Sequence, residues 1–188
     1  MMTREQCLLA LHEQRGDDTV VVTTMGSAAP WSKLSDSDLD FPSVGSAMGH
    51  AADFAMGIAL AQPDRPVWVL NGDGSMLMSL GTMVTICQTP AANLVLFVLA
   101  NNTFEVTGNQ PIPGANVISM VDLARGAGFS QVHEFDSPDS LRCGLPHVLG
   151  LAGPIFVNLP IAPGTEPAPK LPCSLSEPAA HLRAALQS

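Results

Sequence analysis

Asp73 stands between two glycines, Gly72 and Gly74, directly after Asn71 and the apolar run VWVL at 67–70. Glycines let a backbone approach a phosphate closely, and the free amides at the start of a helix favour an anion. The carboxylate adds an oxygen ligand for a hard cation, and Mg²⁺ commonly takes one or two protein oxygens together with phosphate oxygens. The segment predicts a metal-assisted phosphate site, with a plain Asp-Gly turn as the alternative.

A second polar segment, Asn101-Asn102, follows 26 residues after Gly74, at the end of another apolar run. The side-chain oxygen of Asn102 is a second candidate ligand for the same cation. If both runs are neighbouring parallel strands, the crossover between them brings their carboxyl ends to one edge of the sheet. The spacing therefore predicts that Asp73 and Asn102 meet.

Strand and helix patterns alternate along the chain. The expected strands cover 19–25, 65–71, 92–101, 130–135 and 153–160, and the expected helices cover 3–15, 43–62, 75–88, 119–128 and 137–150. The first helix would place Leu8, Leu9 and Leu11 on its apolar side, and 102–118 would be a loop. This alternation indicates an α/β fold with a doubly wound, mostly parallel sheet and helices on both faces.

The composition changes near the end of the chain. Residues 1–162 carry the α/β pattern and are expected to form one domain, whereas the stretch after Pro160 is rich in proline. We expect 163–188 to be a Pro-rich arm with a short helix at 177–187.

The overall composition excludes some partners. The chain has 8 Lys and Arg against 17 Asp and Glu, for a net charge of −9, and no basic run that would bind nucleic acid. No apolar run approaches the roughly 20 residues of a membrane span. Its cysteines lie far apart without a CxxC pair, which indicates reduced thiols and a cytoplasmic location. Only 13% of residues are charged and 46% are hydrophobic, which leaves room for a large buried interface in an oligomer.

The Gly-Asp-Gly and Asn-Asn segments, with their spacing, resemble the diphosphate-binding motif of thiamine-diphosphate enzymes. The segment GSAMGHA at 45–51 is similar to the Gly-x-x-Met-Gly segment of the same family. The resemblance covers roughly residues 20–160, so 1–162 is identified as a thiamine-diphosphate-binding domain of the diphosphate-binding type.

The resemblance implies a set of roles for individual residues. The Mg²⁺ ligands would be the Asp73 carboxylate, the Asn102 side chain and the Phe104 carbonyl. Met48 would support the bent form of thiamine diphosphate, and the Ser46 carbonyl would accept a hydrogen bond from its 4′-amino group. Diphosphate contacts would come from the segment Gly72, Asp73, Gly74 and Ser75.

The family also needs a glutamate from a pyrimidine-binding domain, and this chain has room for only one such domain. The resemblance therefore implies a separate pyrimidine-binding subunit, with the cofactor between the two chains. The nearest likeness is to 2-oxo acid decarboxylases that act on sulfopyruvate or phosphonopyruvate. Lys33 and His50 are the candidates for contacting such a small 2-oxo acid, Lys33 as a point charge and His50 through its imidazole.

Other functions compete with a decarboxylase. The β subunit of a 2-oxo acid oxidoreductase and other thiamine-diphosphate carboligases use a similar domain. A cofactor-binding module without catalysis, or a nucleotide binder, is a further alternative. The sequence has neither a G-x-G-x-x-G after the first expected strand nor the lysine of a P-loop, which argues against a nucleotide binder.

Overall fold

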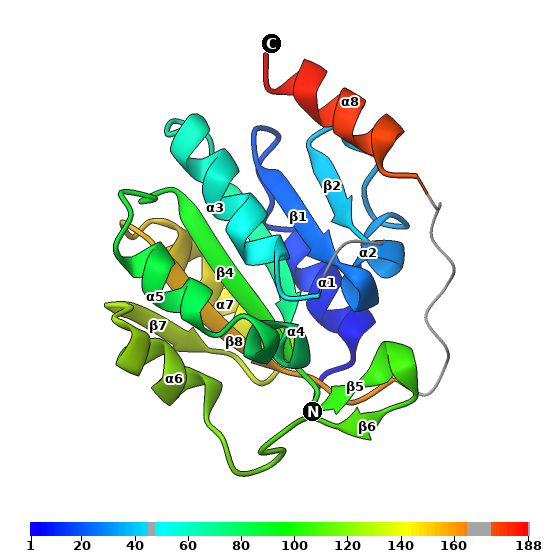
Figure 1. Cartoon of the computed structure of the whole chain (residues 1–188), viewed down its shortest axis with the longest axis vertical. Helices are drawn as coiled ribbons and strands as arrows, with labels where there is room; N and C mark the ends of the chain where they lie inside the picture. The colour runs from blue at the N-terminus through cyan, green and yellow to red at the C-terminus, as the bar shows by residue number, and fades with distance from the viewer. Residues whose placement is uncertain (45–47, 165–173, 188) are drawn as a thin grey trace.

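A computed structural model describes residues 1–44, 48–164 and 174–187 of the chain. Its main sheet has six strands in the order β2-β1-β3-β4-β8-β7, and every neighbouring pair is parallel (Figure 1). In that order the strands are Asp40–Ser43, Val20–Thr24, Val67–Gly72, Leu94–Ala100, Ile155–Pro160 and Gln131–Glu134. A separate antiparallel pair joins β5 (Thr103–Phe104) to β6 (Gln110–Pro111). The predicted fold class is confirmed.

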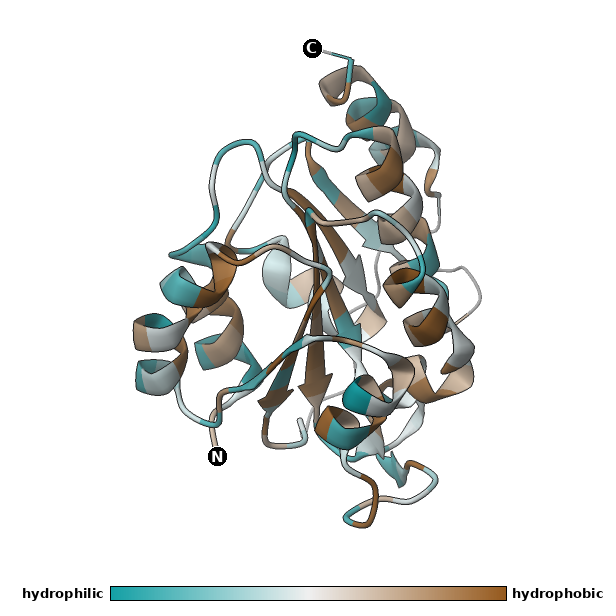
Figure 2. Cartoon of the chain, turned by 90° about the vertical axis from the view of Figure 1, so that its left-hand side faces the viewer, coloured by the Kyte–Doolittle hydropathy of each residue, from teal (hydrophilic) through white to brown (hydrophobic). Residues whose placement is uncertain are grey.

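Helices cover both faces of the sheet. The helices are α1 (Arg4–His12), α2 (Met25–Trp31), α3 (Ala51–Ala61), α4 (Asp73–Met78), α5 (Gly81–Cys87), α6 (Met120–Ala127), α7 (Pro138–Leu149) and α8 (Ser176–Ala185), with a 3₁₀ turn η1 at Glu105–Thr107. Apolar residues of α3, α4, α5, α6 and α8 join one core, and those of α1, α2 and α7 join the other. Figure 2 shows the hydrophobic strands enclosed between these two layers.

Two cores form because successive strand residues point to opposite faces of a sheet. In β1, Val20 and Val22 pack into the first core while Val21 packs into the second. In β4, Val98 and Leu99 divide in the same way. The β-branched and leucine-rich runs therefore appear apolar throughout, as is typical of parallel strands buried on both faces.

β2 and α2 were not predicted from the sequence. β2 has four residues including Pro42, which has no N–H to donate, and such a strand is tolerated because β2 lies at the edge of the sheet. α2 contains Gly26 and Pro30, both unfavourable in helices, yet it buries Ala28, Ala29 and Trp31. In both elements tertiary packing outweighs local propensity.

The single helix expected at 75–88 is two helices. Ser79 ends α4 with non-helical angles, and its hydroxyl donates to the Gly49 carbonyl at 2.5 Å. The chain then starts α5 at Gly81. The break thus attaches the end of α4 to the turn that precedes α3.

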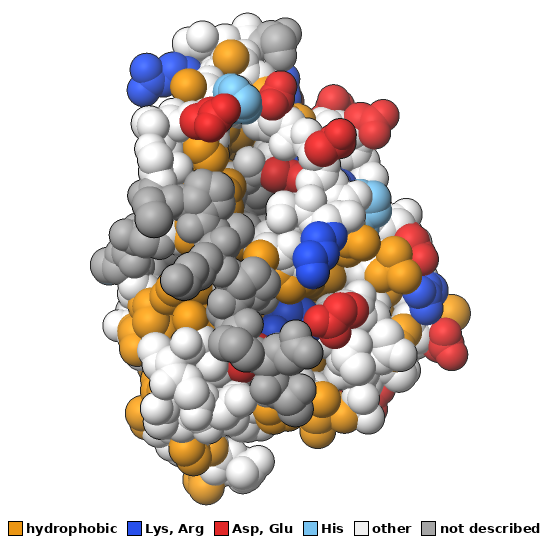
Figure 3. Space-filling view, turned by 90° about the vertical axis from the view of Figure 1, so that its right-hand side faces the viewer, with side chains coloured by type: hydrophobic (Ala, Val, Ile, Leu, Met, Phe, Trp, Pro, Cys, Tyr) orange, Lys and Arg blue, Asp and Glu red, His pale blue; other side chains and the backbone are white. Residues whose placement is uncertain are grey.

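α8 lies against β2, with Leu182 buried in the first core. On the face shown in Figure 3, acidic side chains gather near this end of the molecule. A hollow there is lined by Asp36, Asp38 and Glu177 among other residues, and these negative charges disfavour an anionic ligand. No helix in the described ranges is long and apolar enough to cross a membrane.

The order of the strands predicts which edge of the sheet binds a ligand. β1 lies between β2 and β3, so the chain winds first toward β2 and then back past β1 to β3. Ligands of such sheets bind outside the carboxyl ends of the strands, at the point where the winding reverses. The segments that follow β1, β3 and the adjacent strand β4 are therefore expected to form the ligand site.

The N-terminal helix gives a matched test of the packing. Leu8 and Leu11 of α1 are fully buried, but Leu9 is 41% exposed, so the expectation that all three face the core is wrong for Leu9. Each helical residue turns about 100° from the last, which carries Leu9 away from the side shared by Leu8 and Leu11. Leu8→Ala should lower the free energy of unfolding by about 2–5 kcal/mol, and Leu9→Ala by less than about 0.5 kcal/mol. Denaturant unfolding checks this, and equal losses would contradict the placement of α1.

Candidate functional site

A pocket opens at the carboxyl ends of β1, β3 and β4. The space it encloses is about 730 Å³ when the open solvent at its mouth is included. Its lining comes from Arg4 of α1, residues 24–27, the turn at 48–49 with Ala51, residues 72–75, and the segment after β4. The expected site residues that line it are Met48, Gly72, Asp73, Gly74, Ser75 and Phe104, whereas Asn102 is not part of the lining.

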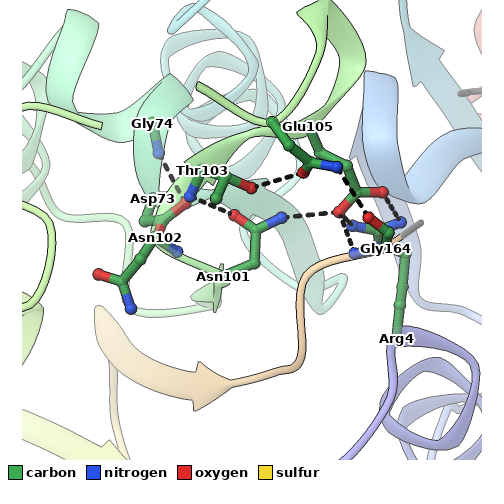
Figure 4. A network of polar contacts seen from close by, with 9 residues as sticks. Arg4, Asp73, Gly74, Asn101, Asn102, Thr103, Glu105 and Gly164 are labelled. Carbon is green, nitrogen blue, oxygen red and sulfur yellow. Dashed lines mark hydrogen bonds and ion pairs between the residues drawn. The ribbon is translucent and has the colours of Figure 1, made fainter. Parts of the chain in front are cut away.

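Asp73 joins the ends of two neighbouring strands. Its side chain is buried, Oδ1 accepts a hydrogen bond from the Gly74 amide at 2.8 Å, and Oδ2 accepts one from the Asn102 amide at 2.7 Å (Figure 4). Burial raises the pKa of Asp73, and the bonds from Asn102 and Gly74 oppose that rise. Each carboxylate oxygen keeps lone-pair capacity after one hydrogen bond, so the group can still bind a cation.

Asn102 meets Asp73 through its backbone rather than its side chain. The residue has φ 60°, in the left-handed region, which turns its amide toward Asp73. Its side chain points away from the Asp73 carboxylate in Figure 4, and Oδ1 accepts from the Asn116 amide at 3.4 Å. The Phe104 carbonyl accepts from the Asn109 amide at 3.1 Å. Asn102 Oδ1 keeps lone-pair capacity after this bond, but its side chain would have to turn toward Asp73 to share a metal ion. The Phe104 carbonyl also accepts from the Thr107 hydroxyl at 3.2 Å, so it would have to release one of its two donors.

No group of three or more His, Cys, Asp or Glu side chains in the described ranges could hold a metal ion. A Mg²⁺ site at Asp73 does not need such a group, since that ion is usually held by one or two carboxylates plus substrate phosphates and water. The buried Asp73 carboxylate, with lone-pair capacity left on both oxygens, fits such an ion.

Ser75 connects the phosphate segment to the turn that carries Met48. The Gly49 amide donates to Ser75 Oγ at 3.1 Å, which leaves the hydroxyl hydrogen of Ser75 free to donate into the pocket. Gly49 has φ +96°, and a Cβ there would lie 2.8 Å from Ser79 Oγ, so glycine is required. Met48 is half-buried at the pocket wall, and Ser46 lies outside the described residues.

The two expected substrate contacts lie away from this pocket. His50 is 60% exposed, and its Nδ1 lies 2.6 Å from Asp53 Oδ2. Asp53 Oδ1 also accepts from the Thr82 hydroxyl, so this carboxylate orients the imidazole. Lys33 is exposed just beyond the end of α2. Neither His50 nor Lys33 is among the residues that line the pocket, and their roles stay predictions.

Arg4 and Glu105 line the pocket but were not predicted as site residues. Their side chains form a two-pronged ion pair, with Arg4 Nη1 and Nη2 donating to Glu105 Oε1 and Oε2 at 2.6 and 2.5 Å. Burial raises the pKa of Glu105, but Arg4, Gly164 and Asn101 outweigh that effect and lower the pKa overall. These partners are 101 residues apart, and no local pattern of sequence signals such a contact.

The pocket and its motif agree with the comparisons to known proteins. The family of the thiamine pyrophosphate enzymes' C-terminal TPP binding domain matches residues 23–159. The chain therefore belongs to this family, and the resemblance deduced from the motifs is confirmed.

Two kinds of decarboxylase are similar in sequence. Phosphonopyruvate decarboxylase from Streptomyces viridochromogenes is 41% identical over 158 residues, which cover 82% of this chain and 38% of that protein. Sulfopyruvate decarboxylase subunit beta from Methanothermobacter thermautotrophicus is 32% identical over 162 residues, covering 86% of this chain and 83% of that subunit. The chain thus spans little more than a third of the phosphonopyruvate decarboxylases that it matches.

Solved structures support the fold. Benzoylformate decarboxylase from Polynucleobacter necessarius superposes with a TM-score of 0.74 at 20% identity, covering 87% of this chain and 34% of that one. At that identity the similarity concerns the fold alone.

The two motif glycines give a test of how the pocket is built. A Cβ on Gly74 would lie 2.6 Å from the Phe104 ring and 3.0 Å from Ile112 Cγ2, whereas a Cβ on Gly72 would meet nothing within 4 Å. Gly74→Ala should therefore lower the free energy of unfolding by about 1–3 kcal/mol, and Gly72→Ala by less than about 0.5 kcal/mol. Thermal and denaturant unfolding measure both, and a larger loss for Gly72→Ala would show that the glycine roles are reversed.

Proposed function

We propose that the chain is the diphosphate-binding subunit of a thiamine-diphosphate-dependent decarboxylase, with a 2-oxo acid of the sulfopyruvate or phosphonopyruvate type as its substrate. The observation that carries the proposal is the buried Asp73 carboxylate in hydrogen-bonded contact with the Asn102 segment, inside a pocket lined by the family's phosphate motif. Its sequence similarity to phosphonopyruvate decarboxylase and to sulfopyruvate decarboxylase subunit beta supports the substrate class.

The residues at the pocket have separate roles in this proposal. Asp73 would hold Mg²⁺, joined by the Asn102 side chain once it turns toward Asp73 and by the Phe104 carbonyl once it releases a donor. The open backbone at Gly72 and the Ser75 hydroxyl would receive the diphosphate.

The second wall of the pocket would orient the cofactor. Met48 would support it from the turn before α3, where the Ser75 and Ser79 contacts fix Gly49, and the Ser46 carbonyl would bind its 4′-amino group. Bound thiamine diphosphate supplies the electron sink for the electron pair released when the bond to the leaving carboxylate breaks. The chain's own residues bind and orient the cofactor and shield it from water.

The active unit in this proposal includes a separate pyrimidine-binding subunit. Support comes from the sequence similarity to a protein that is itself named a β subunit, with 83% of that subunit covered. The exposed positions of His50 and Lys33 mean that they would reach substrate only where the two chains meet. A cytoplasmic location and a hetero-oligomer remain part of the same proposal.

Reconstitution tests the reaction. The chain, co-expressed with a candidate pyrimidine-binding subunit and supplied with thiamine diphosphate and Mg²⁺, should release CO₂ from sulfopyruvate or phosphonopyruvate faster than from pyruvate. The two chains should co-elute in size exclusion, and each chain alone should be inactive. If a cofactor-loaded complex releases no CO₂ from any of the three acids, the decarboxylase assignment fails. The oxidoreductase and the non-catalytic module then become the leading alternatives.

A substitution at Asp73 tests the metal site. Asp73→Asn keeps the shape of the side chain but removes its charge, so Mg²⁺-dependent binding of thiamine diphosphate should weaken by about 100-fold or more. Asp122→Asn, at a side chain that is 73% exposed on α6, serves as the control. Titration calorimetry with and without Mg²⁺ gives the affinities. If Asp73→Asn binds like the control, Asp73 is not a metal ligand.

A further inference from the structure

The Glu105 carboxylate collects hydrogen bonds from three separate parts of the chain. Arg4 of α1 donates twice, Asn101 Nδ2 donates at 2.8 Å, and the amide of Gly164, beyond the end of β8, donates at 2.9 Å (Figure 4). Its side chain is 8% exposed and that of Arg4 is 13% exposed. A charged pair so far from water is maintained only when its hydrogen bonds are satisfied, and here both carboxylate oxygens have donors.

Asn101 connects Glu105 to the segment that contacts Asp73. Its Nδ2 donates to Glu105, while its Oδ1 accepts from the Thr103 amide at 3.0 Å. The side chain of Asn101 therefore spans Asn102 and binds the backbone on its far side, at Thr103. Asn102 is held in a left-handed conformation, and its amide donates to Asp73 Oδ2 at 2.7 Å. The contacts form one continuous path from Arg4 through Glu105 and Asn101 to the carboxylate at the pocket floor.

We propose that Arg4 and Glu105 form a clasp that positions the Asn101–Thr103 turn, and through it the Asp73 carboxylate, for metal and diphosphate binding. They act as positioning residues, since their contacts hold Asn101 rather than a ligand. The effect on cofactor binding rests on the function proposed above. The effect on the turn itself does not, and it can be measured in the chain without cofactor.

The competing explanation is a purely structural ion pair that attaches α1 to the rest of the domain. The same segment of chain provides a matched control for it. Arg15, three residues beyond the end of α1, pairs with Asp40 at 3.0 Å, and the two side chains are 8% and 14% exposed. Asp40 begins β2, at the amino edge of the sheet and opposite the pocket. The two ion pairs are equally buried, but only one lies beside the motif.

The first experiment compares Glu105→Gln with Arg15→Gln in the full chain without cofactor. Hydrogen exchange of the Asn102 amide reports whether its bond to Asp73 is held. We expect exchange to be about tenfold faster in Glu105→Gln after correction for the change in global stability, because the charge-assisted bonds to Arg4 and Asn101 are weakened. In Arg15→Gln the corrected rate should stay at its wild-type value. Equal corrected rates in the two variants would overturn the proposal.

The second experiment uses the assembled complex with thiamine diphosphate. The concentration of Mg²⁺ needed for half-maximal cofactor binding should rise about tenfold in Glu105→Gln and Arg4→Gln and remain unchanged in Arg15→Gln. Arg4→Lys should recover part of the loss, since lysine keeps the charge but not the two-pronged geometry. An unchanged Mg²⁺ requirement in both Glu105→Gln and Arg4→Gln would overturn the role in metal binding.

The two readouts separate this proposal from the proposed function. If wild-type chain does not bind thiamine diphosphate at all, the proposed function fails while the exchange experiment still decides whether the clasp holds the turn. If Glu105→Gln is too unstable to purify, Arg4→Lys takes its place in the exchange experiment, with an intermediate increase expected and no increase contradicting the clasp.

Discussion

The site depends on one buried carboxylate that is hydrogen-bonded by two backbone amides. A charged group withdrawn from water is costly unless donors replace the water. For Asp73 the Gly74 and Asn102 amides supply these donors, one from the start of α4 and one from the segment after β4. Because β3 and β4 are adjacent and parallel, the same interaction that stabilises the carboxylate also fixes the distance between the two halves of the motif.

The layers around the sheet determine what else can reach this carboxylate. Every strand of the main sheet runs in one direction, so the segments that follow β1, β3 and β4 open on one side. Glycine occupies two positions where neighbouring atoms leave no room for a Cβ: Gly49, where the 48–50 turn touches α4, and Gly74, under the Phe104 ring. The break between α4 and α5 contributes to the same close packing, because the Ser79 hydroxyl donates to the Gly49 carbonyl where α4 ends. The apolar cores and the polar pocket are thus connected by a few short contacts.

Sequence alone predicted the parts of this architecture in which one local property dominates. The apolar runs of β1, β3, β4 and β8 identify themselves, and the Gly-Asp-Gly and Asn-Asn segments locate the pocket from their spacing. Four-residue β2 with Pro42 and α2 with Pro30 could not be predicted, because packing against neighbours decides their conformation. The contribution of Asn102 through its amide depends on a left-handed backbone angle, and the pairing of Arg4 with Glu105 depends on the tertiary fold. Neither has a local pattern in the sequence.

The charges of the pocket explain why a metal ion is essential to the proposed function. Among its described lining residues, one cation, Arg4, faces two carboxylates, Asp73 and Glu105. The clasp neutralises Arg4 with Glu105, so the charge that remains at the pocket floor is that of Asp73. A diphosphate brought to this floor without a metal would meet a like charge in a partly buried site, where repulsion is stronger than in water.

A divalent cation on Asp73 reverses the sign of the charge at this site, as bound ions commonly do. The same ion would favour the charged form of the carboxylate and so oppose the effect of burial, which raises the pKa of Asp73. Under this proposal the metal does more than neutralise the cofactor, because it turns a site that repels the diphosphate into one that attracts it. Arg4 does not replace the metal as the diphosphate's positive partner, since its charge is already paired with Glu105 in the clasp.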